Sequence, residues 1–406
     1  MISIGDTAFI LICAALVGIM TPGVAFFYGG LVRRKNFLTL VIQSFISMGV
    51  VTVIWVLVGY SLVFSGGKGG FIGDLDWFAL NGVGQTPGPW AAHIPALAHF
   101  AYLLMFAVIT PTLITGAFAD RVRFSSYLVF LVAWSVLVYL PLAHMTWGGG
   151  WFAAHGVLDF AGGMVVHMSS GFAALASVFV VGRRHFAPGE QKAPHSLAFV
   201  ALGAALLWFG WFGFNAGSAL AANGVAAQAF VNTQVAAAVA MCTWLAIAWL
   251  RDKRPTVLGA LTGAVAGLVV ITPCAGYVAV WAAMVIGLAA GSVCFAAVLL
   301  VEKMDWDDAV DVWAVHGVGG LLGSILVGVF ASSAIDPAAA NGLIYGDLRF
   351  FGWQLLASVL AAGYAFGVTF GLLKLIDVVG SVRVPHKVEL RGLDEAELGE
   401  RAYNLT

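Results

Sequence analysis

Two histidines lie inside apolar segments that are long enough to cross a bilayer. His167 belongs to AGGMVVHMSSGFAALASVFVVG (161–182), and His316 belongs to VWAVHGVGGLLGSILVGVF (312–330). Small residues share a helical face with each histidine, at spacings of three, four or seven: Gly163, Ser170, Gly171, Ala174, Gly319, Gly320 and Gly323. Small residues let helices pack closely, so we expect both imidazoles to point into a bundle. Imidazoles that share one proton can exchange donor and acceptor roles, which predicts a polar track through an apolar pore.

Aromatic side chains and one hydroxyl gather toward the outer ends of three predicted spans. The group comprises Tyr102, Phe106, Trp147, Trp211, Phe214 and Ser218. Aromatic faces with a hydroxyl and no carboxylate suit a small, weakly hydrated cation, since such contacts are worth up to ~2 kcal/mol when desolvated. An aromatic belt at the membrane interface is the alternative for Trp147. Helix packing is the alternative for Phe106 and Phe214, which lie deeper.

Asp159 is the most deeply placed acidic residue. All twenty acidic residues fall in loops, at span ends or in the C-terminal tail, which argues against a proton or sodium pathway of buried carboxylates. Asp159 stands just before AGG at the start of a span, where an N-cap or Asx turn is the ordinary role of an aspartate. It is also placed to orient electrostatically the loop that carries Trp147.

Composition identifies an all-α polytopic membrane protein. The chain is 61% hydrophobic and 10% charged, whereas soluble domains carry about 25% charged residues. Spans of roughly 20 apolar residues are predicted at 6–30, 37–65, 95–119, 124–147, 161–182, 196–220, 226–250, 256–273, 278–301, 310–331 and 352–376. The first twenty residues lack a basic n-region, so we expect a first span and not a cleaved signal. Residues 377–406 form a hydrophilic cytoplasmic tail after the transmembrane domain, 1–376.

The distribution of basic residues tests the predicted topology. With eleven spans, all the lysines and arginines fall on one side except Lys68 and Arg349. Basic residues collect on the cytoplasmic side, which places the N-terminus outside and the C-terminus inside. A net charge of −1 leaves no basic surface for nucleic acid, and the scattered cysteines do not indicate a thiolate metal site.

Spans 1–5 and 6–10 are predicted to form an inverted repeat. GVAFFYGG near the end of span 1 is similar to FGFNAGS near the end of span 6. His167 and His316 each lie about 9 to 10 Å along their helices, from opposite sides of the membrane. A single intramembrane histidine is more often a hydrogen-bonded core residue, but two at mirrored depths favour a functional pair.

Several motifs resemble those of the ammonium transporter family (Amt/Mep/Rh), in order along essentially the whole chain. DFAGGMVVHMSSGFAALASVFVVGRR resembles its signature. The other similar motifs are TPGVAFFYGGLVRRKN, WFGFNAGSA, AFVNT, DDAVDVWAVHGVGG and the tail GLDEAELGERAY. The resemblance to prokaryotic Amt members implies a homotrimer in the cytoplasmic (inner or plasma) membrane, surrounded by lipid, with one pore in each eleven-span protomer. It implies ammonium or ammonia as the substrate, no cofactor, no metal and no enzymatic activity.

The resemblance also assigns roles to individual residues. It implies an outer recruitment site at Trp147, Phe106 and Ser218, and a gate of stacked rings at Phe106 and Phe214. It implies a pore with twin histidines at His167 and His316, supported structurally by Asp159. NH4+ would lose its proton at the gate and cross as NH3. Where the family often has other residues, this chain reads Tyr102-Leu103 beside the gate and Leu398 in the tail.

Two further hypotheses concern other classes of function. The first is an ammonium sensor that signals through its C-terminal tail. Thirty residues follow Ile376, which are too few for a fused signalling domain. A PII-type signalling protein at the cytoplasmic pore exits is the regulatory partner that the resemblance implies. The second is a metalloenzyme or haem protein with His167 and His316 as ligands. The absence of a nearby carboxylate to polarise the imidazoles argues against it.

Overall fold

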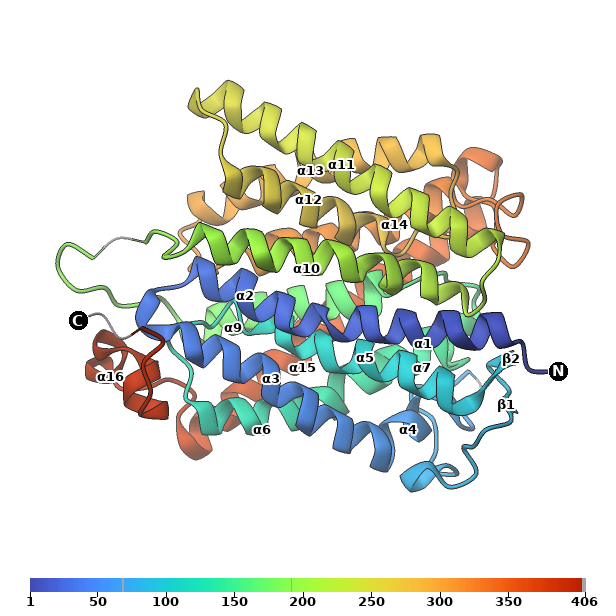
Figure 1. The fold of residues 1–406 in the computed structure, drawn as a ribbon, viewed down its shortest axis with the longest axis horizontal. Helices are drawn as coiled ribbons and strands as arrows, with labels where there is room; N and C mark the ends of the chain where they lie inside the picture. Colours follow the sequence, from blue (N-terminus) through green and yellow to red (C-terminus); the bar gives the residue numbers. More distant parts are fainter. Residues whose placement is uncertain (68, 191, 404–406) are drawn as a thin grey trace.

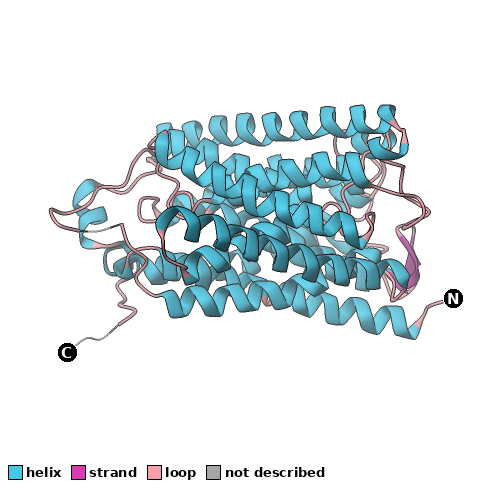
Figure 2. Ribbon diagram, turned by 90° about the horizontal axis from the view of Figure 1, so that it is seen from above, coloured by secondary structure: helices cyan, strands magenta, loops and turns pink. Residues whose placement is uncertain are grey.

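The computed structural model describes residues 1–67, 69–190 and 192–403. Lys68, one of the two basic residues predicted on the outer side, lies outside the described residues, as do the last three residues of the tail. The helices run along the long axis of the molecule, and the two termini lie at opposite ends (Figures 1 and 2). Following the predicted topology, the end with the N-terminus is called the outer end and the end with the C-terminus the inner end.

Ten helical segments in the described chain are long and apolar enough to cross a membrane. In the first half they are α1 with α2 (Ile4–Gly18, Met20–Leu31), η1 to α4 (Arg34–Asn36, Phe37–Ile54, Trp55–Gly59, Tyr60–Phe64), α5 (Ala96–Ile114), α6 to α8 (Phe124–Trp134, Ser135–Tyr139, Leu140–Trp147, Trp151–Ala154) and η5 with α9 (Gly163–Met168, Ser169–Val181). In the second half they are α10 with η6 (Leu197–Ala216, Gly217–Ala219), α11 (Gly224–Asp252), α13 (Val280–Lys303), η7 with α14 (Trp313–Val318, Gly319–Phe330) and α15 (Leu348–Gly380).

A shorter apolar helix, α12 (Val257–Ile271), lies where the sequence predicts the span 256–273. The predicted all-α membrane fold is therefore confirmed, while the count of eleven spans and their orientation stay predictions. The remaining elements are short: η3 (Phe78–Leu80), β1 (Pro87–Gly88), β2 (Ala91–Pro95), η8 (Leu343–Tyr345), α16 (His386–Arg391) and η9 (Asp394–Leu398).

Polar side chains begin several of the helices. Ser3, Ser196, Asn223, Thr256 and Asp347 each accept a hydrogen bond from a backbone N–H in the first turn of the helix that follows. The first N–H groups of a helix have no partner within the helix, and a side-chain oxygen at the N-cap supplies one. These residues therefore define where the helices start, while apolar side chains fill the turns between them.

Two groups of helices surround the centre of the molecule. α10 packs against α1 and α2, and α5 also packs against α1 and α2. On the other side, α9 contacts η7 and α15, and α14 contacts η5. The chain segments around the two histidines therefore face each other, although 149 residues separate them in sequence.

The tail folds back on the inner ends of the helices of the same chain. The carboxylate of Asp394 accepts hydrogen bonds from the backbone N–H groups of Leu38 and Thr39, at 2.9 and 2.8 Å, where α3 begins. Glu389 accepts a hydrogen bond of 2.6 Å from the N–H of His185. Burial works to raise the pKa of Glu389, but the hydrogen bonds from Arg383 and His185 outweigh it and hold the pKa below its ordinary value.

Candidate functional site

His167 and His316 meet inside the bundle. Their Nδ1 atoms are 3.2 Å apart and their rings lie at 24° to each other, with the side chains almost completely buried. A hydrogen bond between two Nδ1 atoms requires that one carries the hydrogen and the other does not. The donor ring then has a bare Nε2, and the acceptor ring has an Nε2–H. The pair can therefore present one acceptor and one donor to a small molecule.

Glycines bring the two histidine segments together. A Cβ atom on Gly171 would collide with the backbone of Gly317. A Cβ atom on Gly320 would lie 2.8 Å from both the carbonyl oxygen of Gly163 and the backbone nitrogen of Met168. The small face around each histidine that the sequence predicts thus lies at the helix crossing, which lets the imidazoles approach within hydrogen-bonding distance.

Asp159 caps the segment that carries His167. Its carboxylate accepts hydrogen bonds from four successive backbone N–H groups, those of Gly162, Gly163, Met164 and Val165, at 2.6 to 3.2 Å. A carboxylate has about four acceptor positions, so all are engaged in holding the start of η5. This is the geometry of an N-cap aspartate, and the structural role of Asp159 stays a prediction.

Asp159 also orients Trp147, through its backbone and not through its charge. The indole Nε1–H of Trp147 donates a hydrogen bond of 2.9 Å to the carbonyl oxygen of Asp159. Trp147 lines an outer vestibule of about 270 Å³, together with Phe106, Tyr102, Ser218 and other residues. The rings of Phe106 and Trp147 are perpendicular, with centroids 5.9 Å apart. The three residues of the predicted recruitment site therefore border one space.

Two stacked phenylalanines close the inner side of this vestibule. The rings of Phe106 and Phe214 are 4.1 Å apart at 24°, and both side chains are buried. Phe106 borders the outer vestibule, whereas Phe214 borders an inner cavity of about 450 Å³ that also reaches both histidines. The ring pair is thus the partition between the two spaces.

Trp211 lies on the inner side of this partition, which corrects its predicted place in the outer aromatic group. Its ring stacks on His167 at a centroid distance of 5.3 Å, and it lines the inner cavity. The indole N–H donates to the hydroxyl of Thr272 at 2.9 Å. Trp211 precedes Ser218 by seven residues, about 10 Å along a helix, so one helical face spans both sides of the gate.

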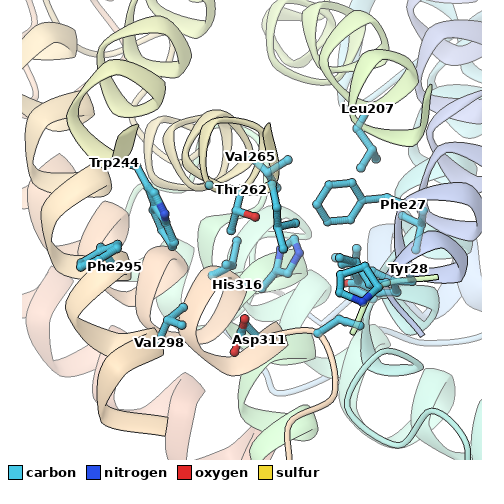
Figure 3. A pocket seen from close by; sticks show the side chains of 18 of the residues that line it. Phe27, Tyr28, Leu207, Trp244, Thr262, Val265, Phe295, Val298, Asp311 and His316 are labelled. Atoms are coloured by element: carbon cyan, nitrogen blue, oxygen red, sulfur yellow. The ribbon is translucent and has the colours of Figure 1, made fainter. Parts of the chain in front are cut away.

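Charged residues line the inner cavity toward the inner end: Lys192, Arg251, Asp252, Glu302 and Asp311. Figure 3 shows Asp311 and His316 in the cavity, opposite Phe27 and Tyr28. Burial, together with the charges of Asp308 and Glu302, raises the pKa of Asp311 to about 8. Asp311 was not among the residues predicted from the sequence, although it stands five residues before His316 in the DDAVDVW motif.

An ion-pair cluster holds the loops beside this cavity. Arg184 binds the carboxylate of Asp307 at 2.7 Å, and Arg33 binds Asp120 at 2.8 Å. Burial works to raise the pKa of Asp307, but the hydrogen bonds and charge of Arg184 outweigh it and hold the pKa below its ordinary value. Within the described residues, no group of three or more histidines, cysteines or carboxylates is arranged to hold a metal ion.

A family model described as "Ammonium Transporter Family" matches residues 8–403. The chain belongs to the ammonium transporter family. It is 46% identical to an ammonium transporter of Bacillus subtilis, over 98% of each chain. It is 45% identical to the ammonium transporter Amt1 of Archaeoglobus fulgidus, over 98% of this chain and 99% of that one.

Solved structures of this family have the same fold. The crystal structure of Candida albicans Mep2 matches with a TM-score of 0.88 at 37% identity, over 95% of this chain and 87% of that one. A sensor Amt protein matches with a TM-score of 0.88 at 28% identity, over 97% of this chain and 98% of that one. As a member of the ammonium transporter family, the protein is a multi-pass membrane transporter of ammonium.

Proposed function

We propose that this ammonium transporter recruits NH4+ in the outer vestibule, removes its proton there, and conducts NH3 past the two histidines. The observation that carries the proposal is the stacked pair Phe106 and Phe214, which separates the vestibule from the cavity that holds His167 and His316. A small neutral molecule can pass between two rings that move slightly, whereas an ion would lose its hydration there.

The vestibule residues suit a cation with N–H donors. The faces of Trp147 and Phe106 attract positive charge, each by up to ~2 kcal/mol in a desolvated site. The hydroxyl oxygen of Ser218 supplies an acceptor. Because Asp159 has both carboxylate oxygens engaged by backbone N–H groups, we assign it a positioning role and not direct contact with the ion.

Beyond the gate, the histidine pair replaces the hydrogen bonds that NH3 loses. The bare Nε2 of one ring accepts a hydrogen bond from NH3, and the Nε2–H of the other ring donates to its lone pair. An intact ion in this apolar passage would be costly. NH4+ therefore gives NH3, which crosses, and a proton, which passes to water in the outer vestibule and stays on the outer side in this scheme. The N–H bond to that proton is the single bond broken, so we infer a transporter and not an enzyme.

Uptake by a strain that lacks its own ammonium transporters tests the proposal. We expect His167→Ala to abolish growth on limiting ammonium, because the pair loses both its mutual hydrogen bond and one pore-facing nitrogen. His155→Ala is the matched control, since His155 packs between Trp151 and Trp353 on the outer side, away from both cavities. Equal growth of the wild type and His167→Ala would contradict the proposal.

An ammonium jump on a solid-supported membrane follows the proton separately. If NH3 alone crosses, ammonia flux occurs without current. A current with retained selectivity would show that the proton follows by another route.

We further propose a homotrimer in the cytoplasmic membrane, with a PII-type protein binding at the inner end. Support for the trimer comes from the similarity to the ammonium transporter family. The docked tail and the charged inner cavity offer polar groups to a protein at the inner end. Native mass spectrometry tests the trimer, and a pull-down with a PII-type protein and ADP tests the partner.

Sensing is the second candidate function, and the similarity to a sensor Amt protein favours it. In this alternative, occupancy of the pore changes how the tail binds the helices. Glu389 and Asp394 hold the tail to the loop after α9 and to the start of α3. Asp394→Ala should then alter a nitrogen-dependent transcriptional response while leaving uptake intact, and loss of both together would argue for transport alone.

A further inference from the structure

The hydroxyl group of Tyr102 joins the two helices that carry the gate. Tyr102 is on α5, one turn before Phe106, and its oxygen lies 2.7 Å from the carbonyl oxygen of Phe214 and 3.0 Å from that of Gly213, both on α10. It also lies 3.1 Å from the hydroxyl of Ser218. The Tyr102 ring contacts Phe106 edge-on, with centroids 5.0 Å apart. One side chain thus touches both gate residues and the hydroxyl of the recruitment site.

The hydrogen-bond directions follow from the number of hydrogens. Tyr102 has one hydrogen, and the carbonyl of Phe214 is its nearest acceptor. The hydroxyl of Ser218 can donate either to the same carbonyl, at 3.0 Å, or to the oxygen of Tyr102. In both cases the Ser218 hydrogen points into the protein and its lone pairs remain available to the vestibule. Ser218 therefore keeps an acceptor even without the Tyr102 hydroxyl.

Tyr102 binds carbonyl groups at the end of α10, which ends at Ala216. The carbonyl oxygen of Gly213 also accepts from the N–H of Gly217, and that of Phe214 lies 3.0 Å from the hydroxyl of Ser218. Gly217 leaves the space for the tyrosine, since a Cβ atom there would lie 2.7 Å from the Tyr102 oxygen and ring edge. Both α5 and α10 pack against α1 and α2. The Tyr102 hydroxyl adds a direct bond from one gate helix to the other.

We propose that Tyr102 is a positioning residue that sets the width of the gate and thereby favours ammonium over larger amines. The proposal rests on the proposed function of the gate. With the hydroxyl in place, α5 and α10 hold the rings of Phe106 and Phe214 in contact, and passage is limited to the gap that ring motion alone opens. Without the hydroxyl the helices can separate further, which admits an added methyl group.

The test is the ratio of methylammonium to ammonium transport in proteoliposomes that contain Tyr102→Phe. We expect the ratio to rise roughly three- to tenfold, the factor that one buried hydrogen bond is typically worth. The increase should be in the maximal rate for methylammonium. The KM for ammonium should stay near its wild-type value, because Trp147, Phe106 and the lone pairs of Ser218 are unchanged.

Tyr127→Phe is the matched control. Tyr127 is equally buried and its hydroxyl donates to the carbonyl of Gln43 at 2.7 Å, but it lines neither cavity. This variant loses the same kind of bond without touching the gate, so its transport ratio should not change. A similar rise in both variants would overturn the proposal, because general loosening of the bundle would then explain it.

Two other outcomes separate the hypotheses. A folded Tyr102→Phe with an unchanged ratio overturns the role of Tyr102 and leaves the proposed function standing. Wild-type protein that fails to conduct ammonia, or that conducts it equally well as His167→Ala, overturns the proposed function itself. If Tyr102→Phe does not fold, Gly217→Ala displaces the tyrosine from its other side, and the same rise in the ratio is expected.

Discussion

The segments that carry His167 and His316 share a local pattern but differ in how tightly it is held. In each, an aspartate stands eight residues before the histidine, and the histidine lies in a π-helical turn, η5 or η7. In each, the residue five positions before the histidine has a left-handed backbone. These residues are Gly162, with φ of 111°, and Asp311, with φ of 60°. An inverted repeat would produce such a shared pattern, and the repeat itself stays a prediction.

The aspartates show the difference. Asp159 uses both oxygens to bind four backbone N–H groups. Asp308 accepts from the N–H of Trp313 at 2.7 Å, while its second oxygen has no hydrogen-bond partner in the described part of the chain. His167 lies between Trp211 and Phe214 of the gate, whereas His316 lies in the inner cavity together with Asp311. The aspartate of the outer half is therefore fully hydrogen-bonded, and the aspartate of the inner half is less constrained.

The largest expected effect is the difference in stability and uptake between Asp159→Ala and Asp308→Ala. Asp159→Ala leaves four buried N–H groups without acceptors, at about 1–3 kcal/mol each where water cannot replace the carboxylate. We expect loss of the folded protein or a fall in uptake of more than about tenfold. Asp308→Ala removes far fewer bonds and should retain measurable uptake. Thermal unfolding in detergent and uptake in cells measure both variants, and equal losses would show that the two halves are held alike.

The next largest effect is a loss of stability at the helix crossing where Gly171 meets Gly317. Gly171→Ala puts a Cβ atom against the backbone of Gly317, and overpacking of this kind typically destabilises by about 1–3 kcal/mol. The histidines should separate and transport should fall with the unfolding temperature. Gly367→Ala is the control, because a Cβ atom there meets nothing within 4 Å. A fully active Gly171→Ala would show that the crossing tolerates displacement.

A smaller effect is a difference in ammonia flux between glutamate variants of the two histidines. His316→Glu places a proton-exchanging group beside the inner cavity, where water and neighbouring polar groups can solvate it. His167→Glu places it against Trp211 and Phe214, where it is desolvated. We expect His316→Glu to retain about tenfold more ammonia flux than His167→Glu. Stopped-flow pH measurements on proteoliposomes compare them, and the reverse order would contradict the difference between the two halves.

The last effect is a pH dependence that arises from the inner half. The pKa of Asp311 is about 8 in the folded protein and about 3.9 in an unfolded chain, so the folded state binds the proton more tightly. Its contribution favours folding at low pH and is lost as the pH rises from about 4 to 8. Asp311→Asn should therefore have a flatter stability profile across this range. Unfolding temperatures from pH 4 to 8 measure it, and parallel profiles for both proteins would exclude the effect.

Several features of the site could be predicted from sequence because they depend on spacing along one helix. The glycines beside each histidine, the capping position of Asp159 and the grouping of Phe214 with Ser218 all follow from helical periodicity. Asp311 has no such local signal. Its importance depends on a cavity between helices, and the match to Gly162 would be found only by aligning the two halves at their histidines.

The sequence by itself determined the membrane class, because apolar segments of this length are stable in hydrocarbon and few charges interrupt them. It also determined the family, through motifs spread over the whole chain. Only the tertiary structure decided on which side of the gate Trp211 lies, and that the hydroxyl of Tyr102 reaches α10. Periodicity places a residue on a face of its own helix, but the depth at which that face meets another helix depends on packing between segments distant in sequence.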